Sequence, residues 1–212
     1  MKRNRRVLIA AIAAAGILCS GIPSSAQAER AANSARPTRI VVPVVNAAHV
    51  VTDGTFSAGE WDGAFRQPLG DNFEVYLLAD SAYLYVGFKY LKDVEAVALS
   101  EVYVATSDKQ FVNLHSSGSL GEGMNDFPPQ GGHPNFSVGN ATGWESNATP
   151  REARLQGKEF KISRARLPGT TVRLAGSMGV VNRTMRESVS FPKDLGFSSP
   201  DGWVELILPP SK

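Results

Sequence analysis

The stretch Asp80-Ser-Ala-Tyr-Leu-Tyr-Val-Gly-Phe-Lys-Tyr90 decides the fold of this 212-residue chain. Its inward-facing candidates fall on every second residue, at Leu84, Val86, Phe88 and Tyr90. Because successive side chains of a strand point to opposite sides of a sheet, this alternation predicts a strand with one buried face. The preceding stretch Asp53-Gly-Thr-Phe-Ser-Ala-Gly-Glu-Trp-Asp-Gly-Ala64 predicts a turn followed by a short element anchored by its tryptophan.

Short apolar runs punctuated by Gly, Asp, Asn or Pro fill most of the remaining chain. Many are rich in Val, Ile, Leu and Tyr, and no long helical pattern is visible. The sequence therefore predicts an all-β fold, an antiparallel β-sandwich with jelly-roll or immunoglobulin-like layers. We expect strands at residues 40–45, 49–52, 73–79, 83–90, 97–105, 111–114, 160–167, 172–181 and 204–208.

The same alternation assigns side chains to the two faces of each strand. The opposite faces carry a surplus of aromatic residues, which could line a ligand platform, lie under long loops or form a second inner layer. These aromatic residues are Tyr76, Tyr83, Tyr85, Tyr103, Phe111 and Trp203. The inward sets are Phe73, Val75 and Leu77; Leu84, Val86 and Phe88; Val102 and Val104; Val112 and Leu114; Phe160 and Ile162; Val172, Leu174 and Met178; and Val204, Leu206 and Leu208.

Residues 116–143 break this rhythm with seven glycines and three prolines. Such a composition does not hold regular strands for long. Connections of this length are uncommon in compact domains and are either functional loops or disordered. Both interpretations stay open for this segment.

The first 28 residues have the pattern of an export signal. Lys2, Arg3, Arg5 and Arg6 precede an apolar run at residues 7–18, and Ala26-Gln-Ala28 offers a small-x-small cleavage site. The run is shorter than the roughly 20 residues that a spanning helix needs, so we expect cleavage and no membrane span afterwards. Lipidation at Cys19, which follows Leu18 rather than a small residue, is the less favoured alternative.

Removing these 28 residues from 212 leaves 184, enough for one domain, and changes the formal charge from +2 to −2. The mature chain then has no cysteine and no basic bias toward nucleic acid. We expect a flexible leader at residues 29–38 and one domain at residues 39–212, secreted or periplasmic in a bacterial cell envelope. The oligomeric state is left open.

The stretches at residues 53–64 and 80–90 together resemble family 9 carbohydrate-binding modules, β-sandwiches of the wider DOMON-like group. The resemblance implies sugar binding without catalysis. Characterised members hold a sugar between two Trp rings, one just before a central strand and one in a loop shortly before the last strand. That central strand resembles Leu99-Ser-Glu-Val-Tyr-Val104, where no Trp precedes it in residues 92–98, and Phe191 stands near the second Trp position.

Sugar recognition uses a flat apolar ring flanked by carboxylate, amide or Arg groups that hydrogen-bond hydroxyls. Trp61 and Trp203 lie in stretches that resemble structural parts of the family, so we assign them to packing. Trp144, just after the long loop, is the tryptophan expected to face a ligand. The predicted ligand-binding residues are Trp144, Phe191, Glu145, Asn147, Asn125 and Asp126, with help from residues 116–143.

Other chemistries remain alternatives. No two carboxylates are paired by the sequence, so we expect no hydrolase or other enzyme. Structural calcium is an option at Asp71-Asn72 or Asn125-Asp126, although ordinary turn residues explain these pairs as well. DOMON-like relatives that hold b-type haem and pass electrons are a second function class; the available groups are Met124, Met178, Met185, Lys89 and His115. A protein-interaction sandwich is the third, with Lys158, Lys161, Arg164 and Arg166 predicted to protect a sheet edge.

Overall fold

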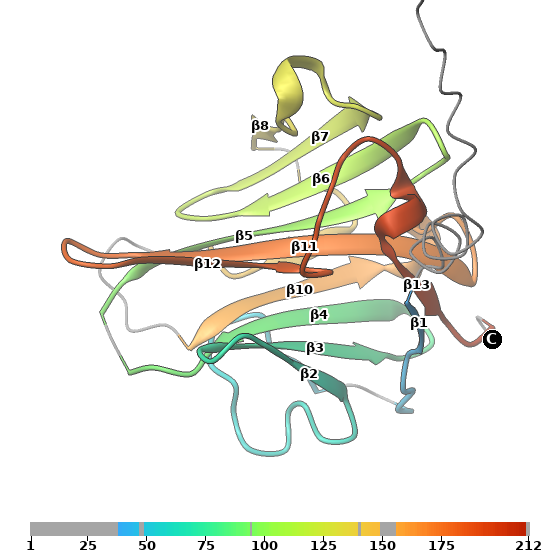
Figure 1. Ribbon diagram of the computed structural model, residues 1–212. Helices are drawn as coiled ribbons and strands as arrows, with labels where there is room; N and C mark the ends of the chain where they lie inside the picture. Colours follow the sequence, from blue (N-terminus) through green and yellow to red (C-terminus); the bar gives the residue numbers. More distant parts are fainter. Residues whose placement is uncertain (1–37, 47–48, 94, 140, 149–155, 211–212) are drawn as a thin grey trace, which may run out of the picture. The chain divides into compact units, whose positions relative to one another are not determined.

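The computed structural model describes residues 38–46, 49–93, 95–139, 141–148 and 156–210 as two layers of strands (Figure 1). The eight-stranded sheet has the order β1-β13-β11-β5-β6-β7-β8, with β12 pairing β11, and the five-stranded sheet has the order β2-β3-β4-β10-β9. Its strands are β1 (Arg39–Val41), β2 (Phe65–Leu69), β3 (Phe73–Ala79), β4 (Tyr83–Tyr90), β5 (Val97–Ala105), β6 (Gln110–Ser116), β7 (Leu120–Asp126), β8 (Ser137–Val138), β9 (Trp144–Ser146), β10 (Gly157–Ser163), β11 (Thr171–Val181), β12 (Arg186–Phe191) and β13 (Val204–Ile207).

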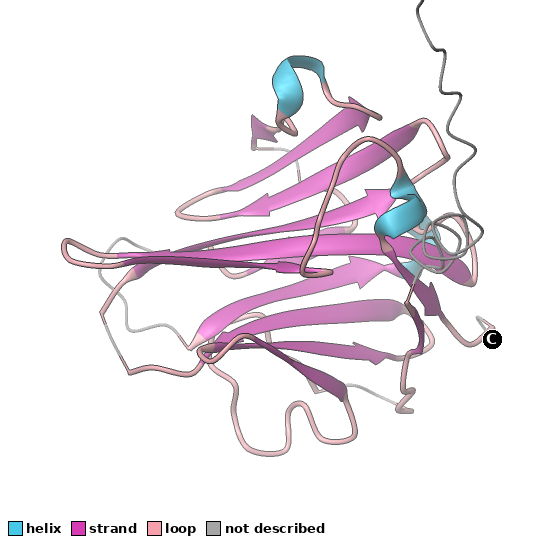
Figure 2. Cartoon of the chain, viewed as in Figure 1, coloured by secondary structure: helices cyan, strands magenta, loops and turns pink. Residues whose placement is uncertain are grey.

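Nearly every strand pair is antiparallel, and β1 with β13 is parallel. The long strand β11 pairs with β13 over its first half and with β12 over its second half, while β5 lies along its other side. The helical pieces in the described part are the short 3₁₀ turns η1 (Gln130–Gly132), η2 (Arg164–Arg166) and η3 (Pro200–Gly202), as Figure 2 shows. The prediction of an all-β sandwich is confirmed.

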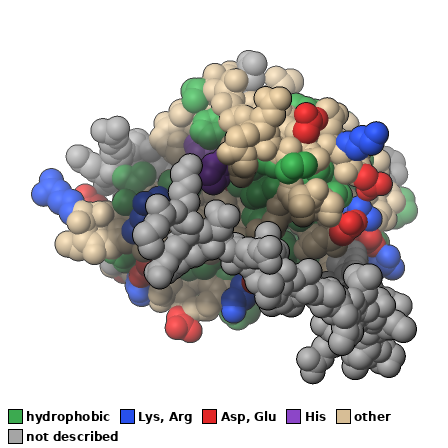
Figure 3. Space-filling model, turned by 45° about the horizontal axis from the view of Figure 1, so that its top comes forward, with side chains coloured by type: hydrophobic (Ala, Val, Ile, Leu, Met, Phe, Trp, Pro, Cys, Tyr) green, Lys and Arg blue, Asp and Glu red, His purple; other side chains and the backbone are tan. Residues whose placement is uncertain are grey.

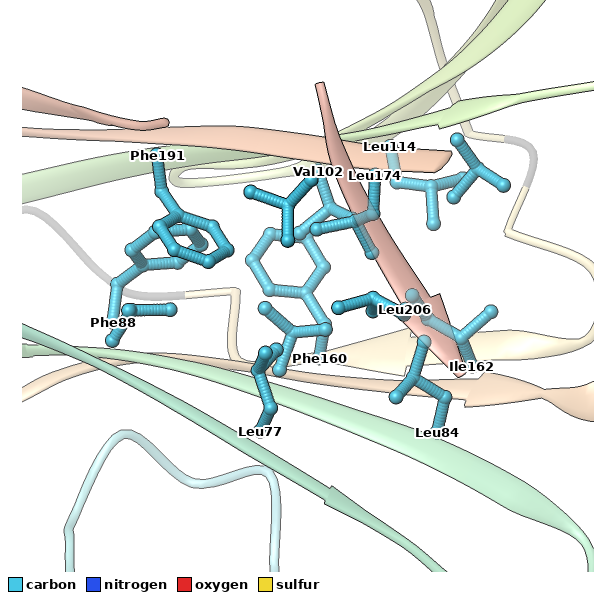
Figure 4. Close-up of a cluster of buried hydrophobic side chains, with 14 of the residues drawn as sticks. Leu77, Leu84, Phe88, Val102, Leu114, Phe160, Ile162, Leu174, Phe191 and Leu206 are labelled. Atoms are coloured by element: carbon cyan, nitrogen blue, oxygen red, sulfur yellow. The ribbon is translucent and has the colours of Figure 1, made fainter. Parts of the chain in front are cut away.

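The core lies between the two sheets, where the predicted inward side chains meet (Figure 4). Every residue assigned to an inward face is buried in this one cluster. Phe88 and Leu77 approach from the five-stranded sheet, and Val102 and Leu174 from the eight-stranded sheet. Burying one such side chain contributes roughly 1.5–3 kcal/mol, so the alternation that predicted the strands also supplies the force that pairs the layers.

The surplus aromatic residues form two further clusters on the outer faces, meaning the faces turned away from the core. On the five-stranded sheet, Tyr76 and Tyr85 pack under Val50, Phe56 and Trp61. On the eight-stranded sheet, Tyr103, Phe111 and Trp203 pack against Phe127, Leu195 and Phe197. Of the three interpretations offered by the sequence, burial under long loops is the one that the structure confirms.

Residues 116–143 hold more regular structure than their composition predicts. Strand β7 pairs with β6 over its full length, and β8 pairs with β7. The glycines serve close packing: a Cβ atom built on Gly123 would lie 2.2 Å from the carbonyl oxygen of Asn135. The expectation of a structureless segment is therefore wrong, because the glycines of β7 let the segment that leads into β8 lie directly against it. The short strands β2, β9 and β12 were also not predicted.

Strand β10 lies between β4 and β9 rather than at an edge. Lys158 is fully buried, and its Nζ donates to the backbone oxygens of Ser117 (3.0 Å) and Asn147 (2.7 Å). Arg164 is buried as well, with a guanidinium that donates to the carbonyl of Asp80 at 3.2 Å. The prediction that Lys158 and Arg164 protect a sheet edge is wrong, because both satisfy carbonyl groups within the fold. Lys161 and Arg166 pair instead with Glu145 and Glu122.

The predicted signal peptide at residues 1–28, including Cys19, and residues 29–37 of the predicted leader lie outside the described residues. No helix in the described ranges is both long enough and apolar enough to cross a membrane.

Candidate functional site

A cluster of polar side chains lies on the outer face of the eight-stranded sheet, where β5, β6 and β11 run side by side. Glu101 of β5 is opposite His115 of β6 on one side and Ser177 of β11 on the other. Tyr103 is opposite Asn113 one pair further along. The strand register thus gathers a carboxylate, an imidazole, a phenol and an amide in two adjacent rows.

Glu101 is the centre of this cluster. Its Oε1 lies 3.1 Å from Nδ1 of His115 and accepts from Nδ2 of Asn113 at 3.5 Å, while Oε2 accepts from the hydroxyl of Tyr103. Burial raises the pKa of Glu101, but the hydrogen bonds from His115 and Tyr103 outweigh it and hold the pKa below its usual value. The carboxylate is therefore ionised at neutral pH, and 19% of its side chain is exposed.

The polar groups around Glu101 are not all satisfied. Nε2 of His115 reaches Oγ of Ser117 at 3.0 Å, but Oδ1 of Asn113 has no hydrogen-bond partner among the described residues. A buried amide oxygen without a partner costs stability, and Asn113 is fully buried, so this oxygen is not on the surface.

Phe136 supplies a flat apolar surface beside this cluster. Its ring stacks on the imidazole of His115, with centroids 3.7 Å apart and planes at 8°, and the residue is 37% exposed. Asn125 holds this segment in place: its Oδ1 accepts from the backbone amide of Asn135 at 2.7 Å, and its Nδ2 donates to the carbonyl of the same residue at 3.0 Å. Figure 3 shows one face of the molecule, on which hydrophobic side chains (green) and a histidine side chain (purple) are visible among backbone and other side chains (tan).

A second half-exposed ring packs against another member of the cluster. Phe197, from the connection between β12 and β13, packs edge-on against Tyr103 with centroids 5.0 Å apart. Figure 1 shows this connection passing over the sheet. Phe136 thus packs on His115 and Phe197 on Tyr103, the two side chains that hold the carboxylate of Glu101.

The same face continues along β5 and β11 toward the start of β5. Leu99 and Gly179 form the next row, and Leu99 is 38% exposed. Beyond them lies a hollow of about 840 Å³ lined by Glu95, Ala96, Val97, Val181, Asn182, Arg183 and Thr184. Along β5, this face therefore carries first the polar cluster around Glu101, then the apolar row of Leu99 and then the hollow.

The two aromatic residues predicted to bind a ligand are in the core instead. Trp144 is 3% exposed, stacks on Phe160 and donates from Nε1 to Glu122 at 2.8 Å. Phe191 is 1% exposed and points between the sheets. Both rings lie at inward positions of their strands, because Trp144 is opposite Ile162 and Phe191 is opposite Gly176. The expectation that they face a ligand is wrong.

The polar residues predicted for the site are dispersed. Glu145 is exposed and pairs with Lys161 at 3.5 Å, and Asn147 is buried, with an amide that bridges to Gly157 and Glu159. Asp126 is exposed and accepts from Gln110 at 3.0 Å. Asn125 is the one that contributes to the cluster, through the segment that carries Phe136.

The metal and haem alternatives gain no support from the described residues. Within them no three His, Cys, Asp or Glu side chains gather into a potential metal site, and Asn72 is engaged with Glu187 at 2.8 Å. Structural calcium stays a prediction. Met178 is buried in the core, Sδ of Met185 accepts from the hydroxyl of Tyr90, and both ring nitrogens of His115 have partners. The packing roles assigned to Trp61 and Trp203 agree with their burial.

Sequence reasoning missed the Glu101 cluster, although a signal for it was present. Glu101 and His115 alternate with the inward residues Val102 and Leu114, so they belong to outer faces. Their pairing across two strands depends on register, which the hairpin turn at residues 106–109 sets.

Comparison with known proteins finds similarity among solved structures. No family profile matches the chain, and no curated protein matches it. One similar solved structure is a family 9 carbohydrate-binding module from Caldicellulosiruptor kristjanssonii in complex with cellotriose, with 13% identity, 81% of this chain and 93% of that chain covered, and a TM-score of 0.47. A family 9 module from the same organism in complex with glucose has 14% identity, coverage of 81% and 96%, and a TM-score of 0.49.

Family 9 modules are thus among the solved structures that this chain is similar to, as the sequence resemblance predicted. At 13% and 14% identity, the similarity says nothing about which residues would bind a ligand.

Proposed function

We propose that this protein binds a carbohydrate on the outer face of its eight-stranded sheet, at Glu101 and His115 beside the ring of Phe136. The observation that carries the proposal is the ionised, partly exposed carboxylate of Glu101 next to an aromatic surface that is 37% exposed. Ionised carboxylates accept strong hydrogen bonds from hydroxyl groups, and an aromatic face packs against the C–H groups of a pyranose ring.

The cluster is held in place before any ligand arrives. His115 and Tyr103 fix both carboxylate oxygens of Glu101, while Asn125 fixes the segment that carries Phe136. Preorganised groups lose little conformational entropy on binding, which favours recognition by a small polar surface. Leu99 is exposed on the same face, so a longer ligand would also contact apolar surface along β5.

The proposed binding is non-catalytic. Glycoside hydrolysis requires two carboxyl groups on either side of the scissile bond. The side chains that contact Glu101 are Tyr103, Asn113 and His115, none of which carries a carboxyl group. Together with the export signal predicted from residues 1–28, this supports a secreted or periplasmic sugar-binding protein.

Titration calorimetry with glucose and cellotriose, followed by affinity electrophoresis across soluble polysaccharides, tests this proposal. Phe136→Ala and Glu101→Gln are expected to weaken binding by about tenfold or more, equivalent to ~1.4 kcal/mol. Tyr83→Ala is the matched control, because it removes a half-exposed ring from the outer face of the other sheet.

Unchanged affinity in both site variants, or no binding of any saccharide by the wild-type protein, would overturn the proposal. Thermal melting of each variant establishes that it is folded before its affinity is compared.

A further inference from the structure

A separate hollow of about 170 Å³ lies on the outer face of the five-stranded sheet, on the other side of the sandwich from Glu101. It opens between the segment at residues 56–62 and the strands β2, β3 and β4. Its lining is Phe56, Ser57, Ala58, Gly59, Trp61, Asp62, Arg66, Tyr76 and Lys89. The proposed carbohydrate site uses none of these residues, and the sequence analysis named Trp61 only for packing and Lys89 only as a group available for haem.

Three aromatic rings build a rigid floor for this hollow. Phe56 stacks on Trp61 with centroids 5.6 Å apart at 17°, and Tyr76 meets Trp61 edge-on at 5.5 Å. Trp61 lies flat on β4 because Gly87 has no side chain there; a Cβ atom would come within 2.8 Å of the indole ring. Nε1 of Trp61 donates to the buried Glu159 at 3.0 Å, which fixes the floor to β10.

Two cationic side chains lie over these aromatic rings. The guanidinium of Arg66 lies 5.1 Å from the centroid of the Tyr76 ring, and Nζ of Lys89 lies 5.5 Å from the centroid of Phe56. Within the described ranges, neither cation makes an ion pair, and the contact of Arg66 with the carbonyl of Trp61 is long, at 3.4 Å. Among the residues that the structure describes, no carboxylate forms an ion pair with either side chain, so we treat both positive charges as candidates to receive an anion.

Two acidic side chains, Glu74 and Asp62, lie near the two cations. Glu74 is opposite Lys89 on the same face, but its carboxylate accepts from the hydroxyl of Tyr76 at 2.6 Å. Asp62 is exposed and lines the hollow as an acceptor. The lining itself thus carries two positive charges and one negative charge.

We infer that this hollow binds an acidic saccharide residue, a pyranose ring that carries a carboxylate or a sulfate group. The ring of Phe56 receives the apolar sugar face, Arg66 and Lys89 receive the anion, and Asp62 accepts a hydroxyl. Arginine presents a planar fork of donors that matches both kinds of oxyanion, and lysine adds a second point charge. This inference does not depend on the Glu101 site.

The test measures binding of three probes to the full chain by chemical-shift mapping and calorimetry: sodium glucuronate, glucose 6-sulfate and glucose. The expected result is that at least one of the acidic probes binds at the hollow more tightly than glucose does. The affinity should fall as NaCl is raised from about 0.05 M to about 0.5 M, because salt screens partly exposed charges. Stronger binding of glucuronate assigns a carboxylate ligand, and stronger binding of the sulfate ester assigns a sulfated one.

The double variant Arg66→Gln/Lys89→Gln should lose about tenfold or more in affinity for the acidic probe, the loss expected for removing charge-assisted contacts. Lys109→Gln is the matched control, because Lys109 is exposed on a distant turn. Both changes are at positions that are not in the core, so melting temperature should be retained. Equal affinity for glucose and both acidic probes, or full retention of binding in the double variant, would overturn the inference.

The two proposed sites can fail separately. Phe136→Ala is expected to leave the acidic probe unaffected, whereas the Arg66/Lys89 double variant is expected to leave cellotriose binding unaffected. Loss of cellotriose binding alone therefore bears on the Glu101 face, and loss of glucuronate or sulfate binding alone bears on the hollow.

Discussion

The outer faces of the two sheets contain the same kinds of side chain, but the pKa of the glutamate is shifted in opposite directions on the two faces. Each face has an aromatic cluster under a covering segment and a glutamate at an outward strand position, Glu101 on β5 and Glu159 on β10. The pKa of Glu101 is lowered, whereas burial raises the pKa of Glu159 to about 7, against hydrogen bonds from Trp61 and Gly54. The side chain of Glu101 is 19% exposed, and Glu159 is fully buried.

The contrast between Glu101 and Glu159 shows that hydrogen bonds stabilise a buried charge only when they outweigh the loss of hydration. Glu101 has His115, Tyr103 and Asn113 around it and keeps some contact with solvent. Glu159 has two donors and no solvent, so it acts as an anchor for the segment that covers its sheet. One face is thereby open for binding near its glutamate, and the other is closed there.

The largest expected effect comes from removing the cover of the five-stranded sheet. Trp61→Ala should destabilise the protein by about 3–5 kcal/mol, because it leaves a large cavity among buried rings and leaves Glu159 with one donor fewer. Phe136→Ala, on the more open face, should cost less than about 1.5 kcal/mol. Urea unfolding monitored by circular dichroism checks both, and equal losses would remove the contrast between the two faces.

The next effect is a pH dependence carried by Glu159. Its pKa is raised from 4.5 to about 7 in the folded state, so the folded state binds the proton more tightly than the unfolded chain does. Stability contributed by protonation is fully present below about pH 4.5 and is lost as the pH rises to about 7. The loss is on the order of 3 kcal/mol for a shift of this size.

Glu159→Gln isolates this dependence. Its free energy of unfolding, measured in urea from pH 4 to pH 8, should lack the decline that the wild-type protein shows across this window. A wild-type curve and a variant curve that run parallel would show that Glu159 is ionised in the fold without penalty.

The smallest effect should come from Glu101 and should have the opposite sign. Because its folded-state pKa lies below the unfolded value, its stabilisation is present above about pH 4.3 and is lost as the pH falls through the folded-state pKa. Glu101→Gln should flatten the acid limb of the stability curve while leaving the range above pH 5 nearly parallel to wild type. A change confined to the range around pH 7 would contradict the assignment.

Much of the fold follows from local pattern. Strands β3, β4 and β5 have the bounds that their alternation predicts, because each has one face buried along its whole length. Strand β7 escaped prediction because Gly121 and Gly123 remove the side chains that would have shown alternation. In the candidate site, Asn125 was identified for its residue type, whereas Glu101 and Phe136 were not.

Trp144 illustrates why the site was harder to predict than the fold. A tryptophan after a glycine-rich segment suggests exposure, yet strand β9 adds to β10 in a register that turns this ring inward. Whether a ring faces the core or solvent depends on a one-residue choice of register, which local sequence does not set.

The alternation within each strand was sufficient to predict which residues fill the core, because burial of apolar surface is encoded in every second position. Where the polar groups meet could be seen only once the strands were placed next to one another. Glu101 and His115 are 14 residues apart in the sequence, and Phe136 comes from the connection between β7 and β8. Their grouping therefore depends on sheet register and on the glycines that let neighbouring segments approach closely. Packing is a property of each strand, whereas a site is a property of how strands are placed side by side.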